Sequence, residues 1–434
     1  MNIGFYRWNE TDTATKARIL ERASANIDAV TGDVQAIIDD VKKRGDTALL
    51  DYAKKFDGAD LNDLQVSKEE IERACKSIDP DLAQAIDHCA KNVQRFHEEQ
   101  YARVEKSWMH EIEPGVWAGE QVSPIPSVGL YVPGGKNLYP TAVYMLSIPA
   151  VIAKVPHIVM VTPPNADGSI GDALLYAAHI SGITEIYKIG GAGAIAALAY
   201  GTETIPAVKK VLGPGSPYVA AAKQILSPIL DPGMPAGPTE SIILCDDSAM
   251  PANTVLDILN EAEHGPDSAA LLVTHDEDLA TYALENLPKE IESLPSPQKE
   301  YCVAVMEGYG GIILTESLEE SIAFANEYAT EHLLLKVKNP DDVIPLIYNA
   351  GEILIGENTP FVLGNYGTGV NHVLPTNGKA NTYSCTSIWD FLKRTSLTQC
   401  DANGLKNLKE PVLRLTEYEE FPAHGNALRK RSQS

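Results

Sequence analysis

Apolar residues recur three and four positions apart over the first quarter of the chain. Residues 33–58 have this spacing, which predicts an amphipathic helical segment. A further helix is predicted to begin after Ser67, because Glu70 stands three residues on, as in a capping box. The helical period continues over residues 81–100. The N-terminal part of the chain is therefore predicted to be mainly helical.

The pattern changes near Pro124, where short apolar runs begin to alternate with glycine- or proline-containing turns and helical patterns. The apolar runs of a first series are SVGLYVPGG, HIVMVTPP, EIYKIGG and KKVLGPG. Those of a second series are ESIILCDD, AALLVTHD, GGIILTES and GEILIGEN. Strand–turn–helix units in series favour parallel sheets with crossover helices.

The proline- and glycine-rich segment 231–238 separates the two series. We therefore predict an α/β fold with two Rossmann-like domains and parallel sheets, a small N-terminal helical segment and a C-terminal extension. The predicted parts are residues 1–25, the N-terminal segment; 26–128 with 238–382, one α/β domain; 129–237, the second domain; and 383–434, the extension. Two domains agree with a length of 434 residues, which exceeds what one core usually supports.

Composition narrows the classes of partner. A formal charge of −24 argues against nucleic acid, because such a chain repels phosphate backbones. A mean hydropathy of −0.12, with no apolar segment of spanning length, argues against a membrane protein. The N-terminus has no signal-peptide pattern, and the 6 cysteines are scattered without a C-x-x-C pair. We expect a cytoplasmic protein with reduced thiols.

Two glycine loops precede helical patterns, at residues 190–201 and 213–223. Glycines let a backbone turn tightly and approach a phosphate at a helix N-terminus. Neither loop has the G-x-G-x-x-G pattern followed by an acid about twenty residues later, so each alone is typical of an ordinary turn between a strand and a helix. The two loops together, with SVGLYVPGG nearby, favour a dinucleotide along one sheet edge.

Polar residues end one predicted helix, in the sequence LNEAEHGPDS. Glu261 and His264 stand three residues apart and project from one helix face. This spacing suits a zinc-binding pair of oxygen and nitrogen atoms, although Glu-x-x-His is also common on helices without any function.

Three other histidines stand in informative places. His332 follows Glu331 at the start of an element that becomes wholly apolar, and burial of such a pair indicates pairing or proton transfer. His372 lies in the glycine- and asparagine-rich GNYGTGVNHVLPT, a loop composition typical of sites. His424 follows an acidic cluster.

The sequence resembles the histidinol dehydrogenase family over nearly its whole length. The matching motifs, in the family's order, are PSVGLYVPGG, IGGAGAIAALAYGTE, MPAGPTE, AEHGPDS, TEHLL, GVNHVLPT and AHGNALR. The resemblance implies a zinc- and NAD-dependent enzyme that oxidises an amino alcohol to an amino acid by two hydride transfers. It also implies a homodimer in which a C-terminal segment brings one zinc ligand to the partner's active site.

The resemblance assigns roles by motif position. The implied zinc ligands are Glu261, His264, Asn365 and His424. The implied catalytic residues are Glu331, which would activate water for aldehyde oxidation, and His332 or His372, which would take the hydroxyl proton. The implied substrate contacts are Thr239, His372 and Glu419, together with His332 and the zinc ligands. The implied cofactor contacts are Tyr131, Gly193 and Ser216.

Several of these positions depart from the family pattern. Glu261 stands where the family usually has glutamine and Asn365 where it has aspartate, so that one carboxylate and one amide remain but exchange places. Thr239 replaces a serine. Gly193 and Ser216 replace a glutamine and an asparagine that bind the cofactor, a change of about 0.5–1.5 kcal/mol per lost neutral contact.

Three functions therefore remain open. The first is oxidation of L-histidinol in histidine biosynthesis. The second is zinc- and NAD-dependent oxidation of another small polar alcohol, for example a sulfonated diol. The third is binding of a metal or ligand without catalysis, which the retained Glu331-His332 pair argues against.

Overall fold

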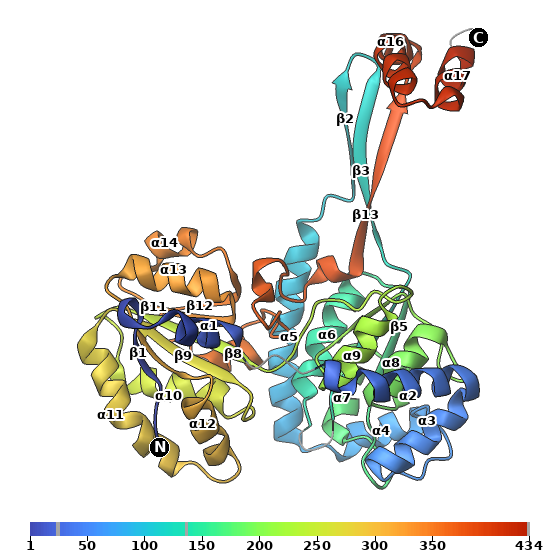
Figure 1. Cartoon of the computed structure of the whole chain (residues 1–434). Helices are drawn as coiled ribbons and strands as arrows, with labels where there is room; N and C mark the ends of the chain where they lie inside the picture. Colours follow the sequence, from blue (N-terminus) through green and yellow to red (C-terminus); the bar gives the residue numbers. More distant parts are fainter. Residues whose placement is uncertain (23–26, 135–137, 432–434) are drawn as a thin grey trace.

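The computed structural model describes residues 1–22, 27–134 and 138–431. It contains two α/β units and an arm that projects away from both (Figure 1). The predicted α/β class with parallel sheets is confirmed, because all strand pairs in the two main sheets are parallel. Within the described residues, no helix is both long enough and apolar enough to span a membrane.

The first unit is built on a six-stranded sheet with the order β1-β10-β9-β8-β11-β12. Its strands are β1 (Phe5–Arg7), β8 (Glu240–Cys245), β9 (Ala269–Thr274), β10 (Gly311–Leu314), β11 (Thr330–Lys336) and β12 (Ala350–Ile355). Helices α10 (Pro251–Ala262), α11 (Glu277–Ser293), α12 (Gln298–Glu307) and α15 (Phe361–Tyr366) cover one face. Helices α1 (Thr13–Glu21), α13 (Leu318–Tyr328) and α14 (Pro340–Val343) cover the other. Strands β8 to β11 are buried throughout, as parallel strands between helical layers must be.

The second unit is built on a four-stranded sheet with the order β6-β5-β4-β7. Its strands are β4 (Ser127–Tyr131), β5 (His157–Thr162), β6 (Ile186–Lys188) and β7 (Lys210–Leu212). One face carries α2 (Thr31–Arg44), α3 (Asp46–Tyr52), α8 (Gly191–Tyr200) and α9 (Pro217–Leu226). The other carries α4 (Lys68–Ser77), α5 (Pro80–Ala102), α6 (Pro140–Ile152) and α7 (Asp172–Ile180).

The helices before β4 pack differently from the division made on the sequence. Residues 26–128 were grouped with 238–382, but α2 buries Val34 and Ile38 against the four-stranded sheet, and α4 and α5 cover its opposite face. The apolar stripe of an amphipathic helix shows that the helix packs on another surface, but it does not show on which sheet. The N-terminal segment also differs, since it adds β1 to the six-stranded sheet beside its helix.

The arm is an antiparallel sheet of three strands with two helices at its end. The strands β2 (Ser107–Glu113), β3 (Val116–Pro124) and β13 (Leu392–Cys400) pair in the order β13-β3-β2. Helices α16 (Ala402–Tyr418) and α17 (Pro422–Arg431) follow β13 and lie at the end farthest from the two α/β units (Figure 1). The predicted C-terminal extension therefore joins a hairpin from the first third of the chain.

Candidate functional site

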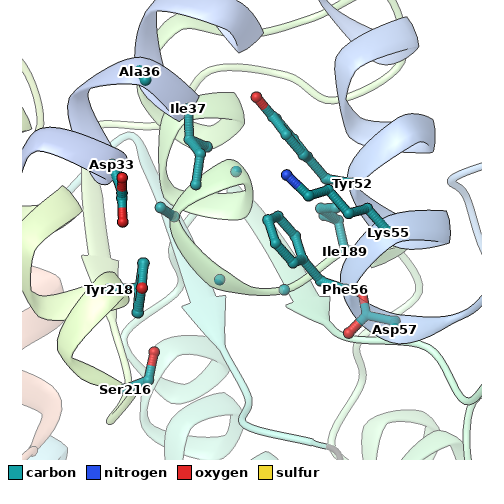
Figure 2. A pocket seen from close by; sticks show the side chains of 14 residues that line it. Asp33, Ala36, Ile37, Tyr52, Lys55, Phe56, Asp57, Ile189, Ser216 and Tyr218 are labelled. Carbon is teal, nitrogen blue, oxygen red and sulfur yellow. The ribbon is translucent and has the colours of Figure 1, made fainter. Parts of the chain in front are cut away.

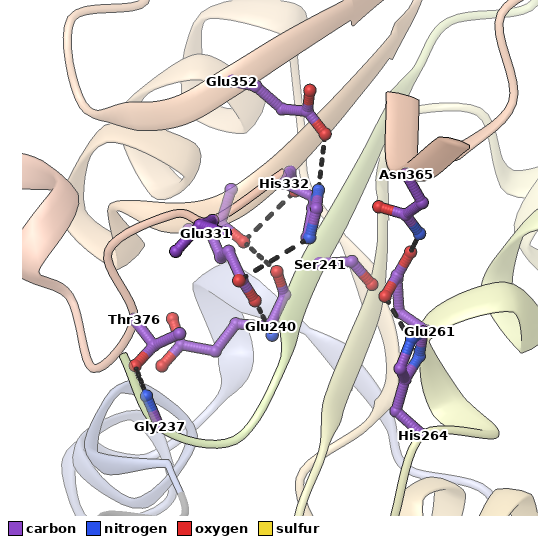
Figure 3. A network of polar contacts seen from close by, with 12 residues as sticks. Gly237, Glu240, Ser241, Glu261, His264, Glu331, His332, Glu352, Asn365 and Thr376 are labelled. Carbon is purple, nitrogen blue, oxygen red and sulfur yellow. Dashed lines mark hydrogen bonds and ion pairs between the residues drawn. The ribbon is translucent and has the colours of Figure 1, made fainter. Parts of the chain in front are cut away.

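The end of α10, the turn that follows it and α15 bring three of the predicted metal ligands together. Glu261 lies on the last turn of α10, and its carboxylate is only 1% exposed. Asn365 lies on α15 and donates a hydrogen bond from Nδ2 to Oε1 of Glu261 at 2.7 Å. Nδ1 of His264 lies 3.2 Å from Oε2 of Glu261 (Figure 3). The predicted proximity of Glu261 and His264 is present, but the predicted shared helix face is not, because α10 ends at Ala262 and His264 lies in the turn after it.

This group fits a divalent metal by its donor chemistry. The carboxylate of Glu261 is buried among an amide and an imidazole, and a buried charge needs a counter-charge or further hydrogen bonds. One carboxylate, one imidazole and one amide oxygen form a set that zinc accepts. Within the described ranges, no three histidine, cysteine, aspartate or glutamate side chains gather as a metal site, so the set depends on the amide of Asn365.

The remaining predicted ligand lies elsewhere in the same chain. His424 is on α17 at the end of the arm, where its ring packs near Phe421 at 5.1 Å between centroids. Glu419, a predicted substrate contact, ends α16 beside it and is exposed. Figure 1 shows both helices well away from α10 and α15. A single chain therefore brings together Glu261, His264 and Asn365 without His424 or Glu419.

A second group lies on neighbouring strands of the same sheet. Glu331 and His332 are the second and third residues of β11, and both are buried. His332 is in register with Glu352 on β12, and its Nδ1 lies 2.5 Å from Oε1 of Glu352. Its other nitrogen, Nε2, lies 3.7 Å from Oε1 of Glu331. The imidazole is thus held between two carboxylates (Figure 3).

Burial and charge move the pKa values of this pair. Burial raises the pKa of Glu331 to about 8, although His332 and the backbone N–H of Glu240 oppose the shift. Burial alone lowers the pKa of His332, but the carboxylates around it, first among them Glu331, outweigh burial and raise it to about 10. Perturbed and mutually coupled groups of this kind are typical of sites that transfer protons.

His372 lies in the same electrostatic environment. Burial, with the charge of His332, lowers the pKa of its imidazole to about 4, so the ring is neutral at neutral pH. Its Nε2 is buried without a hydrogen-bond partner among the described residues. The loop that carries it is anchored on the other unit, because Asn371 donates from Nδ2 to the carbonyl of Met145 at 2.6 Å. A neutral imidazole with a free nitrogen suits hydrogen bonding to a ligand.

The second unit contains a pocket of about 650 Å³ at its glycine loop (Figure 2). Gly190, Gly193 and Ser216 are among the residues that line it. Tyr131 supports the loop, since the backbone N–H of Gly191 donates to its hydroxyl at 3.1 Å. Gly191 has a φ of 61°, a left-handed conformation that glycine adopts without strain. The pocket combines a glycine turn with a helix N-terminus, the arrangement that binds phosphate groups.

Two of the three predicted cofactor positions, Gly193 and Ser216, line this pocket, while Tyr131 does not, and the pocket adds residues that the sequence did not indicate. Its far wall comes from α2, α3 and the turn that follows, and contributes Asp33, Tyr52, Phe56 and Asp57. Phe56 is 60% exposed, and burial raises the pKa of Asp57 to about 6. These residues belong to the helical segment that packs on the four-stranded sheet, so only the tertiary arrangement reveals them.

The predicted substrate contact Thr239 lies just before β8, and its carbonyl accepts from the backbone N–H of Ala269 at 2.9 Å. The next residue, Glu240, has a clearer part in the site, because its backbone N–H donates to Oε2 of Glu331 at 3.0 Å. Neither Glu240 nor Glu352 was singled out on the sequence. Each is an acidic residue near the start of an apolar strand. Only the register of the parallel strands shows that these acids lie beside Glu331 and His332.

Comparisons of sequence and of structure with known proteins point to the same family. A family model described as histidinol dehydrogenase matches residues 20–432. A histidinol dehydrogenase from Synechocystis sp. is 46% identical and covers 95% of each chain. A histidinol dehydrogenase homolog from Colwellia psychrerythraea is 42% identical over 98% of this chain and 96% of that protein. The crystal structure of histidinol dehydrogenase from Elizabethkingia anophelis superposes with a TM-score of 0.93, at 35% identity over 98% of this chain and 96% of that one.

The similarity extends over both sheets, the arm and every segment that carries the residues described above. The family model matches residues 20–432, and the superposed structure covers 98% of this chain. The chain therefore belongs to the histidinol dehydrogenase family of oxidoreductases.

Proposed function

We propose that this protein is a zinc- and NAD-dependent dehydrogenase that oxidises L-histidinol to L-histidine through the aldehyde. The observation that carries the proposal is the buried Glu331-His332 pair on β11, held in the same electrostatic environment as Glu261. Such a pair supplies proton transfer, and the neighbouring carboxylate, imidazole and amide supply a metal-binding set. Relatives named histidinol dehydrogenase, such as that of Synechocystis sp., support the substrate.

The metal would be held by Glu261, His264 and Asn365, with His424 as a fourth ligand. Bound zinc supplies a Lewis acid that anchors and orients the nitrogen atoms of an amino alcohol. Glu261 at the end of α10 and His264 in the turn after it already lie 3.2 Å apart, so the chain holds two donors together before any ligand binds. Binding would compensate the buried charge of the Glu261 carboxylate.

The chain's own groups account for the proton transfers. Removing hydride from an alcohol requires a base for the hydroxyl proton. The neutral His372, or His332 once it has lost its own proton, can accept it through a ring nitrogen. The aldehyde must then gain water before a second hydride leaves. Once ionised, the carboxylate of Glu331 can take a proton from that water, while the backbone N–H of Glu240 holds its other oxygen.

The pocket at residues 190–193 supports binding of NAD, which accepts hydride when bound. Its glycine turn lies at the N-terminus of α8, which suits a pyrophosphate group. The smaller residues Gly193 and Ser216 leave fewer hydrogen-bond donors there than the family pattern has. We expect NAD to bind through the backbone and the surrounding side chains.

The arm supports a homodimer with shared active sites. His424 and Glu419 lie at its end, apart from the residues with which they are proposed to act. A second subunit can supply both residues if its arm reaches across the dimer. No nucleic acid or membrane partner forms part of this proposal.

The Glu261–Asn365 exchange favours a second candidate, which is oxidation of another small polar alcohol by the same chemistry. The exchange moves the negative charge from α15 to α10 and so changes where a cationic or anionic substrate group is stabilised. Relatives named only as homologs of histidinol dehydrogenase, 42% and 44% identical, leave room for this candidate.

Absorbance of NADH decides between these candidates. The protein is incubated with saturating zinc and NAD and with histidinol, a sulfonated diol or other small polar alcohols. Histidinol is expected to give NADH and, after the second oxidation, histidine. If histidinol gives none while another alcohol does, the second candidate holds. Metal binding without turnover of any alcohol would indicate a binding protein and refute both.

A further inference from the structure

Arg22 is a buried cation behind the candidate site. It directly follows α1, and its side chain is 4% exposed. Its Nη1 lies 3.2 Å from Oε2 of Glu240, whose side chain is 3% exposed. The guanidinium also stacks on the ring of Tyr328, 3.8 Å from the ring centre. Burial of a long charged side chain is rare unless the charge is paired.

Glu240 connects this cation to the candidate catalytic residue. Its backbone N–H donates to Oε2 of Glu331 at 3.0 Å. Its carbonyl accepts from Oγ1 of Thr330 at 3.1 Å, and its Oε1 accepts from the backbone N–H of Asn377 at 2.5 Å. Glu240 thus fixes the start of β11 through its backbone and the loop at Asn377 through its side chain. Movement of Glu240 would therefore move Glu331.

The loop on the opposite side of Arg22 leaves little space. A Cβ atom at Gly378 would come within 2.7 Å of Nη1 of Arg22, and Gly378 has a φ of 66°. Arg22 is therefore enclosed by the ring of Tyr328, the carboxylate of Glu240 and the turn at Gly378. This enclosure holds the guanidinium in one position, whereas the side chain of a surface arginine can adopt many positions.

We propose that Arg22 is a positioning residue of this site: its charge favours the ionised form of Glu240 and holds that side chain in place, and the backbone of Glu240 in turn holds the carboxylate of Glu331. The inference rests on the proposed function, since it concerns the group assigned to activate water. Two buried carboxylates, Glu240 and Glu331, lie side by side, and like charges disfavour the ionisation of both. A fixed cation on the far side of Glu240 offsets this repulsion.

The charges around Glu331 decide the sign of the effect. The titratable and charged groups that face it, directly or through His332 and Glu240, are His332 on β11, Glu240 on β8, Glu261 on α10, Glu352 on β12, Tyr328 on α13, His372 in its loop and Arg22. Without Arg22, Glu240 and Glu331 compete for one proton, and Glu331 is fully ionised only at higher pH. Without the charge of Glu240, Glu331 ionises at lower pH.

The test is the pH profile of kcat/KM for aldehyde oxidation in four zinc-loaded forms: the unaltered protein, Arg22→Met, Glu240→Gln and the double variant. Arg22→Met is expected to move the rise in activity to higher pH by about half a unit or more. Glu240→Gln is expected to move it to lower pH, and the double variant to return it toward the original. Arg22→Lys should restore part of the effect, because it keeps the charge.

Arg18→Met is the matched control. Arg18 lies on the same helix but is exposed and binds the carbonyl of Gly308 and the hydroxyl of Tyr6. It should leave the profile unchanged. Equal loss of kcat in both single variants, without opposite shifts or recovery in the double variant, would show that Arg22 serves only the stability of the fold.

An infrared titration provides a readout that does not depend on turnover, because protonated and ionised carboxyl groups absorb differently. Arg22→Met is expected to gain a protonated buried carboxyl at a pH where the unaltered protein has it ionised. Glu240→Gln and Glu331→Gln assign the band. Absence of this gain would overturn the inference even in a protein that oxidises alcohols. If no alcohol is oxidised, the proposed function fails, while the titration still decides the role of Arg22.

Discussion

His332 and Glu352 stand opposite each other on neighbouring parallel strands, and Nδ1 of His332 lies 2.5 Å from Oε1 of Glu352. This contact fixes the orientation of the ring and leaves Nε2 toward Glu331, at 3.7 Å. The strand pairing of β11 and β12 therefore selects the ring nitrogen that is available for proton transfer. A carboxylate that orients a histidine in this way also favours the imidazolium form.

Glu352→Gln should lower kcat with little change in KM for the alcohol. The amide keeps the shape of the side chain but removes the charge that orients the ring and raises the pKa of His332. We expect a loss of about 10- to 100-fold, less than the roughly 10²- to 10⁴-fold contribution of the acid–base group itself. Steady-state NADH formation measures it, and Glu357→Gln, a carboxylate bound to Lys336 on the same sheet, is a control for general loss of charge. An unchanged kcat would exclude an orienting role.

Glu331→Gln should impair aldehyde oxidation more than alcohol oxidation, because only the second reaction needs an activated water. A loss of about 10²- to 10⁴-fold is expected for the aldehyde as substrate. The two reactions are measured separately by supplying the alcohol or the aldehyde with NAD. An equal loss in both would contradict the water-activating role.

The pH dependence of the two reactions separates the candidate bases. Aldehyde oxidation should rise with pH through about 8, because Glu331 must lose its proton to act and its pKa is raised. If His372 accepts the hydroxyl proton, alcohol oxidation stays level from pH 6 to 8 (about two units above its pKa), since His372 is already neutral there. A rise of alcohol oxidation toward pH 10 would instead assign the base to His332. Profiles of kcat/KM for each substrate provide the measurement.

Exchanging Glu261 and Asn365 tests the metal set. Glu261→Gln alone leaves two amides and no carboxylate in the set. It should lower the affinity for zinc by at least about 10- to 100-fold, the loss typical of removing a group that only supports a ligand. The double variant Glu261→Gln, Asn365→Asp returns one carboxylate to the set and should recover most of the affinity. Calorimetry with zinc measures both, and the double variant is the matched control for charge. Unchanged zinc affinity in Glu261→Gln would remove Glu261 from the ligand set.

Mixing two variants that both lack aldehyde oxidation tests the shared site, with the aldehyde supplied as substrate. In a heterodimer of His424→Ala with Glu331→Gln, the His424→Ala subunit keeps Glu331 and receives the arm of the other subunit with its intact His424. One of the two sites is then complete. Random exchange of subunits should therefore restore about a quarter of the original activity. NADH formation before and after mixing measures this recovery. Complete absence of recovery, despite heterodimers detected by mass spectrometry, would mean that His424 acts within its own subunit.

The sequence by itself determined much of the local structure. The apolar runs with glycine or proline ends correspond to the parallel strands of both sheets except β1 and β11, which were not predicted. The Ser67–Glu70 capping box is present as predicted at the start of α4. The three-residue spacing correctly predicted that Glu261 and His264 lie together, although His264 stands in the turn after α10 and not on the helix. These features follow from backbone periodicity, which acts over a few residues and can be read along the chain.

Only the tertiary structure decided which elements meet. Helices α2, α4 and α5 have apolar faces that either sheet could cover, and their packing on the four-stranded sheet was not foreseen. Glu352 reaches His332 through strand register, and Arg22 reaches Glu240 across more than two hundred residues of chain. Sheet order and domain packing bring these groups together through contacts between distant segments. A periodic pattern specifies the face of an element but carries no information about its partner.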